Sequence, residues 1–235
     1  MIPRTFDLDL PFDAPPYRLS GVLVGALMNH AAALAALGAA VHEPPYKAPP
    51  RGPILFIKPR NTLAASGSEV AVPAFAEELE IGASLGLVIG RTACRVGERQ
   101  ALDHVAGYTL VADLGVPHAS FYRPQVRFKA LDGSCLIGPR VVARDAIGDP
   151  DEIAIRVSLD GASVQLARTS GMVRPAARLL ADVSDFMTLR PGDVLMLGVA
   201  LGAPRARAGQ AFAIEADGIG RLEGHVVREH AQVPA

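Results

Sequence analysis

The sequence predicts a mainly β fold with a few helices (α+β), in which mixed sheets form a β-roll or sandwich. Two apolar runs, at residues 83–90 and 105–113, are rich in Val, Ile and Leu and are bounded by glycine. Such runs are typical of strands covered on both faces. Because the strands do not alternate regularly with helices, the pattern argues against a Rossmann or barrel fold and favours one mixed β domain.

The chain has 235 residues, enough to bury a good core, and we expect a single domain over residues 1–235. Residues 1–20 form an N-terminal extension in this prediction. A β-hairpin is one arrangement for it, because FDLDL alternates apolar and acidic side chains before two prolines break the pattern. The next stretch, LSGVLVGAL at residues 19–27, predicts a buried strand.

An Ala-rich helix is expected after this strand, with Asn29 as its N-cap. The following twelve residues, HEPPYKAPPRGP, contain five prolines and predict an extended surface loop. A short strand, ILFI, then leads into the cationic loop KPRNT at residues 58–62.

The central runs at 83–90 and 105–113 are followed by a third expected strand at residues 125–131. Three further strands are expected within residues 141–168, and Asp160-Gly161 is a dipeptide typical of a type I′ hairpin turn. Residues 173–189 carry apolar side chains at helical spacing, and Pro175 is acceptable in a first helical turn. Strands near residues 194–201 and a final hairpin at 211–227 complete the prediction.

Composition excludes several classes of partner. The net charge is −1 with no basic block, and 5% of residues are aromatic with no Trp, so neither nucleic acid nor an anionic membrane is expected to bind. No apolar run reaches the ~18–20 residues of a membrane span, and the acidic N-terminus does not resemble a signal peptide. Cys94 and Cys135 lack a CxxC spacing and predict inert thiols in a cytoplasmic protein.

Four strings in order give the chain a resemblance to the fumarylacetoacetate hydrolase superfamily, in particular to the N-terminal-half type of the bifunctional isomerase/decarboxylase of 4-hydroxyphenylacetate (homoprotocatechuate) degradation. The resemblance covers roughly residues 17–230 and implies a mixed β-roll that assembles as a dimer or pseudo-dimer. The strings are PPYKAPPRGPILFIKPRNT (44–62), VAGYTLVADLGVP (105–117), SFYRPQVRFKALDGSCLIGP (120–139) and DFMTLRPGDVLMLG (185–198).

The resemblance implies an activity on enolisable keto-acids with Mg²⁺ or Mn²⁺ as the cofactor. Such reactions pass through an enolate, whose charge a hard cation held by carboxylates stabilises. Asp113 matches the family's metal-binding Asp, and Lys129 and Lys58 match its active-site lysines and are the expected catalytic residues. We expect Arg60, Tyr122 and Arg123 to bind a keto-dicarboxylate or tricarboxylate, because Arg suits bidentate carboxylate contacts.

The chain departs from the family pattern at the metal ligands. Gly82 and Ser84 stand where the family has its Glu-x-Glu, and Glu78 and Glu80 lie four residues too early, about 13 Å along a strand. A single carboxylate at Asp113 is a poor site for Mg²⁺. Other family positions are replaced as well: Ala112 for an Asn, Pro117 for an Arg, Ala33 and Ala36 for a His-x-x-Glu pair, and residues 197–200 for a Thr-Gly-Thr-Pro loop.

Three functions remain open from the sequence. The first is a subunit of 2-hydroxyhepta-2,4-diene-1,7-dioate isomerase/5-oxopent-3-ene-1,2,5-tricarboxylate decarboxylase, working as a homodimer. The second is a degenerate subunit that assembles with a metal-competent homologous subunit, which the missing Glu-x-Glu favours. The third is a metal-free module that binds a dicarboxylate through Lys58, Arg60 and Lys129.

Overall fold

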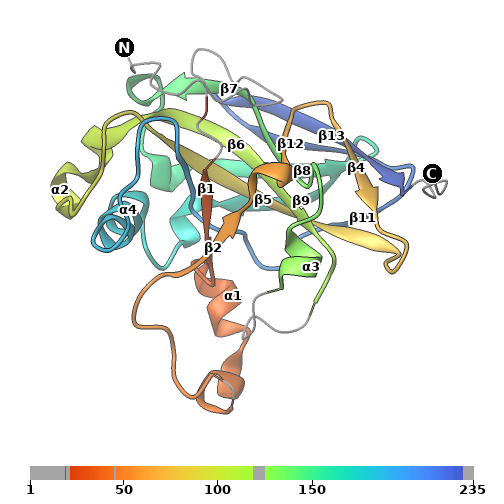
Figure 1. Ribbon diagram of the computed structural model, residues 1–235, viewed down its shortest axis with the longest axis horizontal. Coiled ribbons are helices and arrows are strands. Elements are labelled where there is room, and N and C mark those ends of the chain that lie inside the picture. The colour runs from red at the N-terminus through yellow and green to blue at the C-terminus, as the bar shows by residue number, and fades with distance from the viewer. Residues whose placement is uncertain (1–18, 20–21, 45, 119–124, 230–235) are drawn as a thin grey trace.

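Two β-sheets form the framework of the described chain and pack against each other around a shared apolar core (Figure 1). The computed structural model describes residues 19, 22–44, 46–118 and 125–229. The expected N-terminal extension therefore lies outside the described residues, apart from Leu19, which is buried. The mainly β fold class expected from the sequence is confirmed.

The larger sheet has eight strands and is mixed, because β1 pairs in parallel with β10 and β3 pairs in parallel with β7, while the other pairs are antiparallel. Its order is β2-β1-β10-β5-β6-β7-β3, and β11 extends it by pairing with the first residues of β5. The strands are β1 (Leu23–Leu27), β2 (Ile54–Lys58), β3 (Leu63–Ala65), β5 (Glu78–Ile89), β6 (Val105–Gly115), β7 (Cys135–Ala143), β10 (Val194–Met196) and β11 (Arg205–Arg207).

The smaller sheet has five strands in the order β4-β13-β12-β8-β9. Its hairpin between β8 and β9 turns at Asp160 and Gly161, whose φ angles of 47° and 84° confirm the predicted type I′ turn. The strands are β4 (Glu69–Val72), β8 (Ala154–Leu159), β9 (Ala162–Arg168), β12 (Ala211–Ala216) and β13 (Gly220–Arg228).

The helices of the described chain are short and lie beside the sheets, with α2 and α4 together at one side of the larger sheet (Figure 1). None of them has the length and apolar character that crossing a bilayer requires. The α-helices are α1 (Ala31–Ala35), α2 (Glu98–Ala101), α3 (Val126–Lys129) and α4 (Ala176–Ser184). The 3₁₀ segments are Gly38–His42, Arg60–Thr62, Leu102–His104, Arg144–Ala146, Pro150–Glu152 and Thr169–Gly171.

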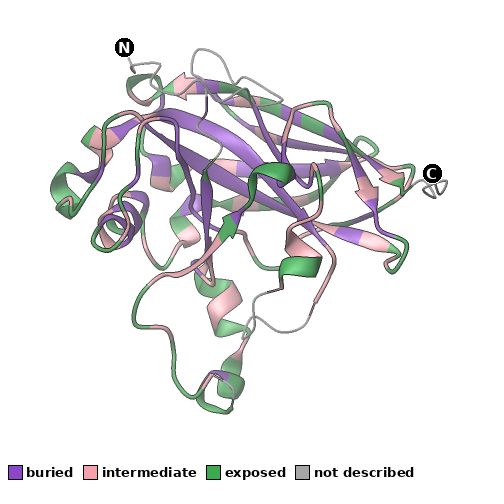
Figure 2. Ribbon diagram, viewed as in Figure 1, coloured by how far each residue is buried: buried purple, intermediate pink, exposed green. Residues whose placement is uncertain are grey.

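The centre of the molecule is the long antiparallel pair β5 and β6, whose residues are almost all buried (Figure 2). One face of this pair packs on the smaller sheet, through residues such as Leu85 and Leu110. The other face carries a second apolar cluster that includes Val88 and Val111. Burial on both faces explains why these two segments are continuous apolar runs in the sequence.

One predicted strand is wrong. Residues 125–131 contain the single-turn helix α3 instead, closed by hydrogen bonds from the Phe128 and Lys129 amides to the Gln125 carbonyl. The alternating pattern there is too short to separate a strand from one helical turn. The contact from the Val116 amide, just after β6, to the Phe128 carbonyl fixes the segment in its helical form.

The predicted helix cap at Asn29 is also wrong. His30 is the N-cap residue of α1, and no side chain caps this helix. The Asn29 side chain is buried and turns toward two other segments of the chain. The helix expected at residues 173–189 is present but shorter, since α4 spans Ala176–Ser184.

Candidate functional site

Three charged side chains from separate segments meet on one face of the larger sheet. Asp113 lies near the end of β6, Lys58 is the last residue of β2, and Lys129 is the last residue of α3. The Lys58 Nζ lies 2.9 Å from Asp113 Oδ1, and the Lys129 Nζ donates to Oδ2 at 2.7 Å. Both carboxylate oxygens of Asp113 therefore face an ammonium group.

Lys58 is fully buried, and its ammonium group is surrounded by oxygen atoms. Besides the Asp113 carboxylate, its Nζ donates to the Ser134 hydroxyl at 3.2 Å and to the Lys129 carbonyl. An ammonium group has three protons, and here three oxygen atoms lie around it. The site thus compensates the cost of burying this charge.

Lys129 reaches Asp113 by crossing β6 directly above Gly115. A Cβ at Gly115 would lie 2.7 Å from the Lys129 Cδ and 2.9 Å from the Phe128 carbonyl oxygen, so a side chain there would displace the lysine. The Lys129 Nζ also lies 5.8 Å from the centre of the Phe56 ring. With 24% of its side chain exposed, Lys129 is the member of the trio that solvent can reach.

Two ammonium groups around one carboxylate determine the protonation of Asp113. Burial by itself raises the pKa of this carboxyl group, but the charges of Lys129 and Lys58 and their hydrogen bonds outweigh burial, so its pKa lies below the usual value. Asp113 is therefore an anion at neutral pH. Counted by formal charge, two lysines and one carboxylate give the trio one net positive charge.

Cys135 stands directly opposite Asp113 in the pairing of β6 with β7. Its side chain is buried, and burial raises the pKa of the thiol to about 12 against the smaller opposing effects of Lys58 and Lys129. A thiol with this pKa stays protonated at neutral pH and is a poor nucleophile or metal ligand. Its environment agrees with the inert thiol expected from the sequence.

The two positions that match the family's Glu-x-Glu lie beside Asp113, as the alignment of motifs predicts. Gly82 pairs directly with Asp113 across β5 and β6, and Ser84 pairs with Val111, so their side-chain positions share one face with the Asp113 carboxylate. The space at Gly82 is filled, because a Cβ there would lie 2.9 Å from Val199 Cγ2 and 2.9 Å from the Asp113 carbonyl oxygen. The Ser84 hydroxyl accepts from the Gly198 amide at 3.2 Å.

These residues do not fit the Mg²⁺ or Mn²⁺ expected from the resemblance. A divalent cation needs several hard oxygen ligands, while Asp113 already faces two ammonium groups and Gly82 offers no side-chain ligand. Nowhere in the described residues do three or more His, Cys, Asp or Glu side chains group as a metal site would require. A cation would also have to approach against the net positive charge of the trio.

Glu78 and Glu80 do not replace the missing ligands, as expected from their spacing. Glu80 stands opposite Gly115, and Glu78 lies two residues further from Asp113 along β5. The Glu78 carboxylate forms an ion pair with Arg205 of β11 at 3.0 Å. The first residues of β5 therefore pair with β11, both by backbone hydrogen bonds and through this ion pair.

Of the predicted substrate-binding residues, Arg60 alone lies among the described residues. Arg60 opens a 3₁₀ turn after β2 and is exposed, while Tyr122 and Arg123 lie outside the described residues. Arg127 stacks on the Phe75 ring at 4.1 Å. The roles of Arg60, Tyr122 and Arg123 in substrate binding therefore stay predictions.

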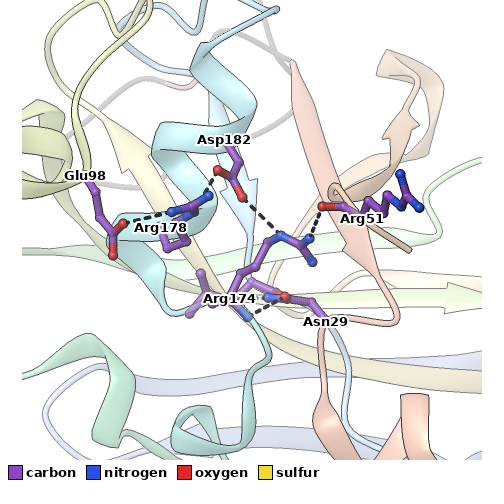
Figure 3. Close-up of polar contacts among 7 residues, drawn as sticks. Asn29, Arg51, Glu98, Arg174, Arg178 and Asp182 are labelled. Atoms are coloured by element: carbon purple, nitrogen blue, oxygen red, sulfur yellow. Dashed lines mark hydrogen bonds and ion pairs between the residues drawn. The ribbon is translucent and has the colours of Figure 1, made fainter. Parts of the chain in front are cut away.

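The sequence analysis missed the structural part played by Asn29. Its Nδ2 donates to the Leu197 carbonyl at 2.8 Å and to the Arg174 carbonyl at 3.0 Å, while its Oδ1 accepts from the Arg174 amide at 2.9 Å (Figure 3 shows the Asn29 and Arg174 pair). An Asn two residues after a buried strand is a signal for such a role, since a buried amide must find hydrogen-bond partners.

Comparison with known proteins identifies the family of this chain. The family model described as fumarylacetoacetate (FAA) hydrolase C-terminal matches residues 23–227. The 4-hydroxyphenylacetate degradation bifunctional isomerase/decarboxylase of Escherichia coli is 36% identical over 211 residues, which are 90% of this chain and 48% of that protein. The chain thus spans about half the length of these curated relatives.

Solved structures show the same fold. The 2-hydroxyhepta-2,4-diene-1,7-dioate isomerase from Mycobacterium marinum superposes with a TM-score of 0.72 at 28% identity, covering 91% of this chain and 77% of that chain. A maleylpyruvate hydrolase from Sphingobium sp. SYK-6, solved with manganese(II) and pyruvate, gives 0.73 at 25% identity, covering 89% and 71%. The chain belongs to the fumarylacetoacetate hydrolase family and is related to its isomerase/decarboxylase members.

Proposed function

We propose that this chain is the non-catalytic subunit of an isomerase/decarboxylase assembly in 4-hydroxyphenylacetate catabolism. Its partner in this proposal is a homologous, metal-competent subunit that processes 2-hydroxyhepta-2,4-diene-1,7-dioate or 5-oxopent-3-ene-1,2,5-tricarboxylate. The observation that carries the proposal is the ion-paired carboxylate of Asp113. Lys58 and Lys129 lie on its two oxygens, and Gly82 and Ser84 lie beside it.

The chemistry of the related proteins explains why this observation matters. The maleylpyruvate hydrolase that shares this fold was solved with manganese(II) and pyruvate, a keto-acid that chelates a hard cation. Enolate chemistry of keto-acids needs stabilisation of the charge that develops on oxygen. In this chain the groups that would hold the cation are missing, so we assign that step to the partner.

The length of the relatives supports a partner of similar size. The match covers 48% of the Escherichia coli isomerase/decarboxylase, so that protein contains about as many residues again outside the matched region. That remainder is long enough for a second domain of this size. In our proposal, a homologous, metal-competent unit of this size carries out the catalytic step.

The test is reconstitution with a family member from the same source that retains the Glu-x-Glu and Asp ligands. We expect the purified chain alone to show no isomerase or decarboxylase turnover at saturating Mg²⁺ or Mn²⁺, to co-purify with the partner, and to raise the partner's activity. Asp113→Asn in this chain leaves the activity of the complex unchanged if the complex forms. Turnover by the chain alone, or a partner with full activity that never co-purifies, would falsify the proposal.

A second candidate function is binding of a dicarboxylate without metal. The observation that favours it is the net positive charge of the Asp113 trio, together with the 24% exposure of the Lys129 side chain. We expect calorimetry to detect binding of the two pathway acids, and we expect Lys129→Met to weaken it. Lys47→Met, a change at an exposed lysine, is the control. No heat of binding with either acid at millimolar concentration would remove this candidate.

A further inference from the structure

Residues 197–199 cover both of the positions from which the family's cation ligands have been lost. Val199 packs over Gly82, with its Cγ2 at 2.9 Å from the position of a Cβ there. One residue earlier, the Gly198 amide donates to the Ser84 hydroxyl at 3.2 Å. The Leu197 amide adds a backbone hydrogen bond to the Leu85 carbonyl at 3.0 Å. The segment is thus attached to β5 along the whole length of the lost site.

Asn29 holds this segment from the other side. Its Nδ2 donates to the Leu197 carbonyl, and Gly198 (φ +124°) passes so close that a Cβ there would lie 3.3 Å from the Asn29 Cβ. The position is one that glycine accepts and other residues rarely adopt. A side chain larger than hydrogen at residue 198 would therefore push the segment away from Asn29 and from Ser84.

Asn29 is itself fixed by Arg174, which belongs to an ion-pair network (Figure 3). The Arg174 Nε donates to Asp182 of α4 at 3.1 Å, and its guanidinium also donates to the Arg51 carbonyl at 3.1 Å. Arg178 binds the other oxygen of Asp182 at 2.8 Å. The anchor of the 197–199 segment is therefore tied to α4 and to the loop before β2, and its position is set by more than local contacts.

We propose that residues 197–199, with Asn29 as their positioning residue, form a stopper that closes the Asp113 site to divalent cations. The stopper keeps the site closed even when carboxylates are restored at positions 82 and 84, because Val199 occupies the space into which a side chain from position 82 extends. The Lys58 and Lys129 ammonium groups supply the positive charge that Asp113 requires. This inference deepens the proposed metal-free role and rests on it.

The first experiment measures whether Asn29 fixes the segment. Hydrogen exchange of the full chain is followed at the Gly198 amide in wild type, Asn29→Ala and Asn29→Asp. Both variants lose the donor to the Leu197 carbonyl, and we expect Gly198 to exchange about 10-fold faster, the effect of one lost hydrogen bond. Ser184→Ala, which removes a buried hydrogen bond to the Val96 amide away from the stopper, is the matched control.

In that experiment, Asn29→Asp loses the hydrogen bonds from Nδ2 to the Leu197 and Arg174 carbonyls but keeps the acceptor for the Arg174 amide, so its comparison with Asn29→Ala isolates the contact with that amide. Faster exchange confined to residues 197–199 supports the inference. Exchange at Gly198 that stays unchanged, or that rises equally in Ser184→Ala, overturns the positioning role of Asn29.

The second experiment measures Mn²⁺ binding by calorimetry in two designed variants of the full chain. Gly82→Glu with Ser84→Glu restores the carboxylates under the stopper, and adding Val199→Ala removes the side chain that covers position 82. We expect the triple variant to bind Mn²⁺ about 10-fold tighter than the double variant, the effect of relieving one overpacked contact. Equal affinity in the two, whether strong or undetectable, overturns the stopper.

A double-mutant cycle measured without metal tests the contact between positions 82 and 199 if these variants do not fold. Gly82→Ala places one methyl group against Val199, and we expect Val199→Ala to be less harmful in that background than in wild type. Additive effects on the urea midpoint contradict a tight contact between the two positions. A different result, metal-dependent turnover by the wild-type chain alone, would contradict the proposed function.

Discussion

Replacing Lys58 by methionine is expected to lower the free energy of unfolding by about 1–3 kcal/mol, the usual cost of leaving buried hydrogen-bond acceptors without their donor. Methionine keeps much of the length and apolar stem of lysine, so the change removes the charge without a large cavity. What remains is the buried carboxylate of Asp113 with Lys129 as its ion-pair partner, and Ser134 and the Lys129 carbonyl without their donor.

Urea unfolding followed by circular dichroism measures this effect. Lys47→Met is the control, because Lys47 is exposed and should change stability by less than about 0.5 kcal/mol. Lys129→Met should lie between the two, since Lys129 is partly exposed and solvent screens its charge. A Lys58→Met protein as stable as the control would show that the Lys58 ammonium does not stabilise the folded site.

Asp113→Asn is expected to destabilise the protein more than Lys58→Met does, by about 3–5 kcal/mol at pH 7. The substitution leaves the buried Lys58 ammonium without a counter-charge while keeping the size of the side chain. It also removes a group whose pKa is lower in the folded protein than in the unfolded chain, because Lys129 and Lys58 outweigh the effect of burial. The same substitution therefore changes how stability depends on pH.

The sign of this pH dependence follows from linkage. A carboxyl group whose pKa is depressed by folding stabilises the protein above its unfolded pKa of about 3.9, and this contribution is lost as the pH falls through the folded pKa. Wild type should therefore lose stability below about pH 4, relative to Asp113→Asn. Urea midpoints measured from pH 7 to pH 2 test this, and parallel curves for the two proteins would contradict it.

Both predictions concern the two ammonium groups that compensate the charge of the Asp113 carboxylate. A maleylpyruvate hydrolase of the same fold was solved with manganese(II) and pyruvate, whereas the Asp113 site of this chain has two ammonium groups on one carboxylate. Ammonium groups compensate the charge of Asp113 as a cation would, but they cannot bind substrate oxygens as a Lewis acid does. This difference is the reason why our proposal assigns the catalytic chemistry to a homologous partner.

The sequence by itself determined the fold class, most strands and the deficit at the cation site. Runs that are apolar on both faces had to be central strands, and β5 and β6 are (Figure 2). The family resemblance identified Gly82 and Ser84 as the positions that match the Glu-x-Glu, and the structure pairs Gly82 with Asp113. Asp160-Gly161 specified its turn because few residues accept positive φ.

Only the tertiary structure decided what fills the place of the missing ligands. Lys58, Asp113 and Lys129 are distant in sequence, and the pairing of both lysines with one carboxylate depends on how β2 and α3 reach β6. Residues 125–131 became a helical turn, and Asn29 became an anchor rather than a cap, for a related reason. A short local pattern is compatible with several conformations, and contacts between distant segments select one of them.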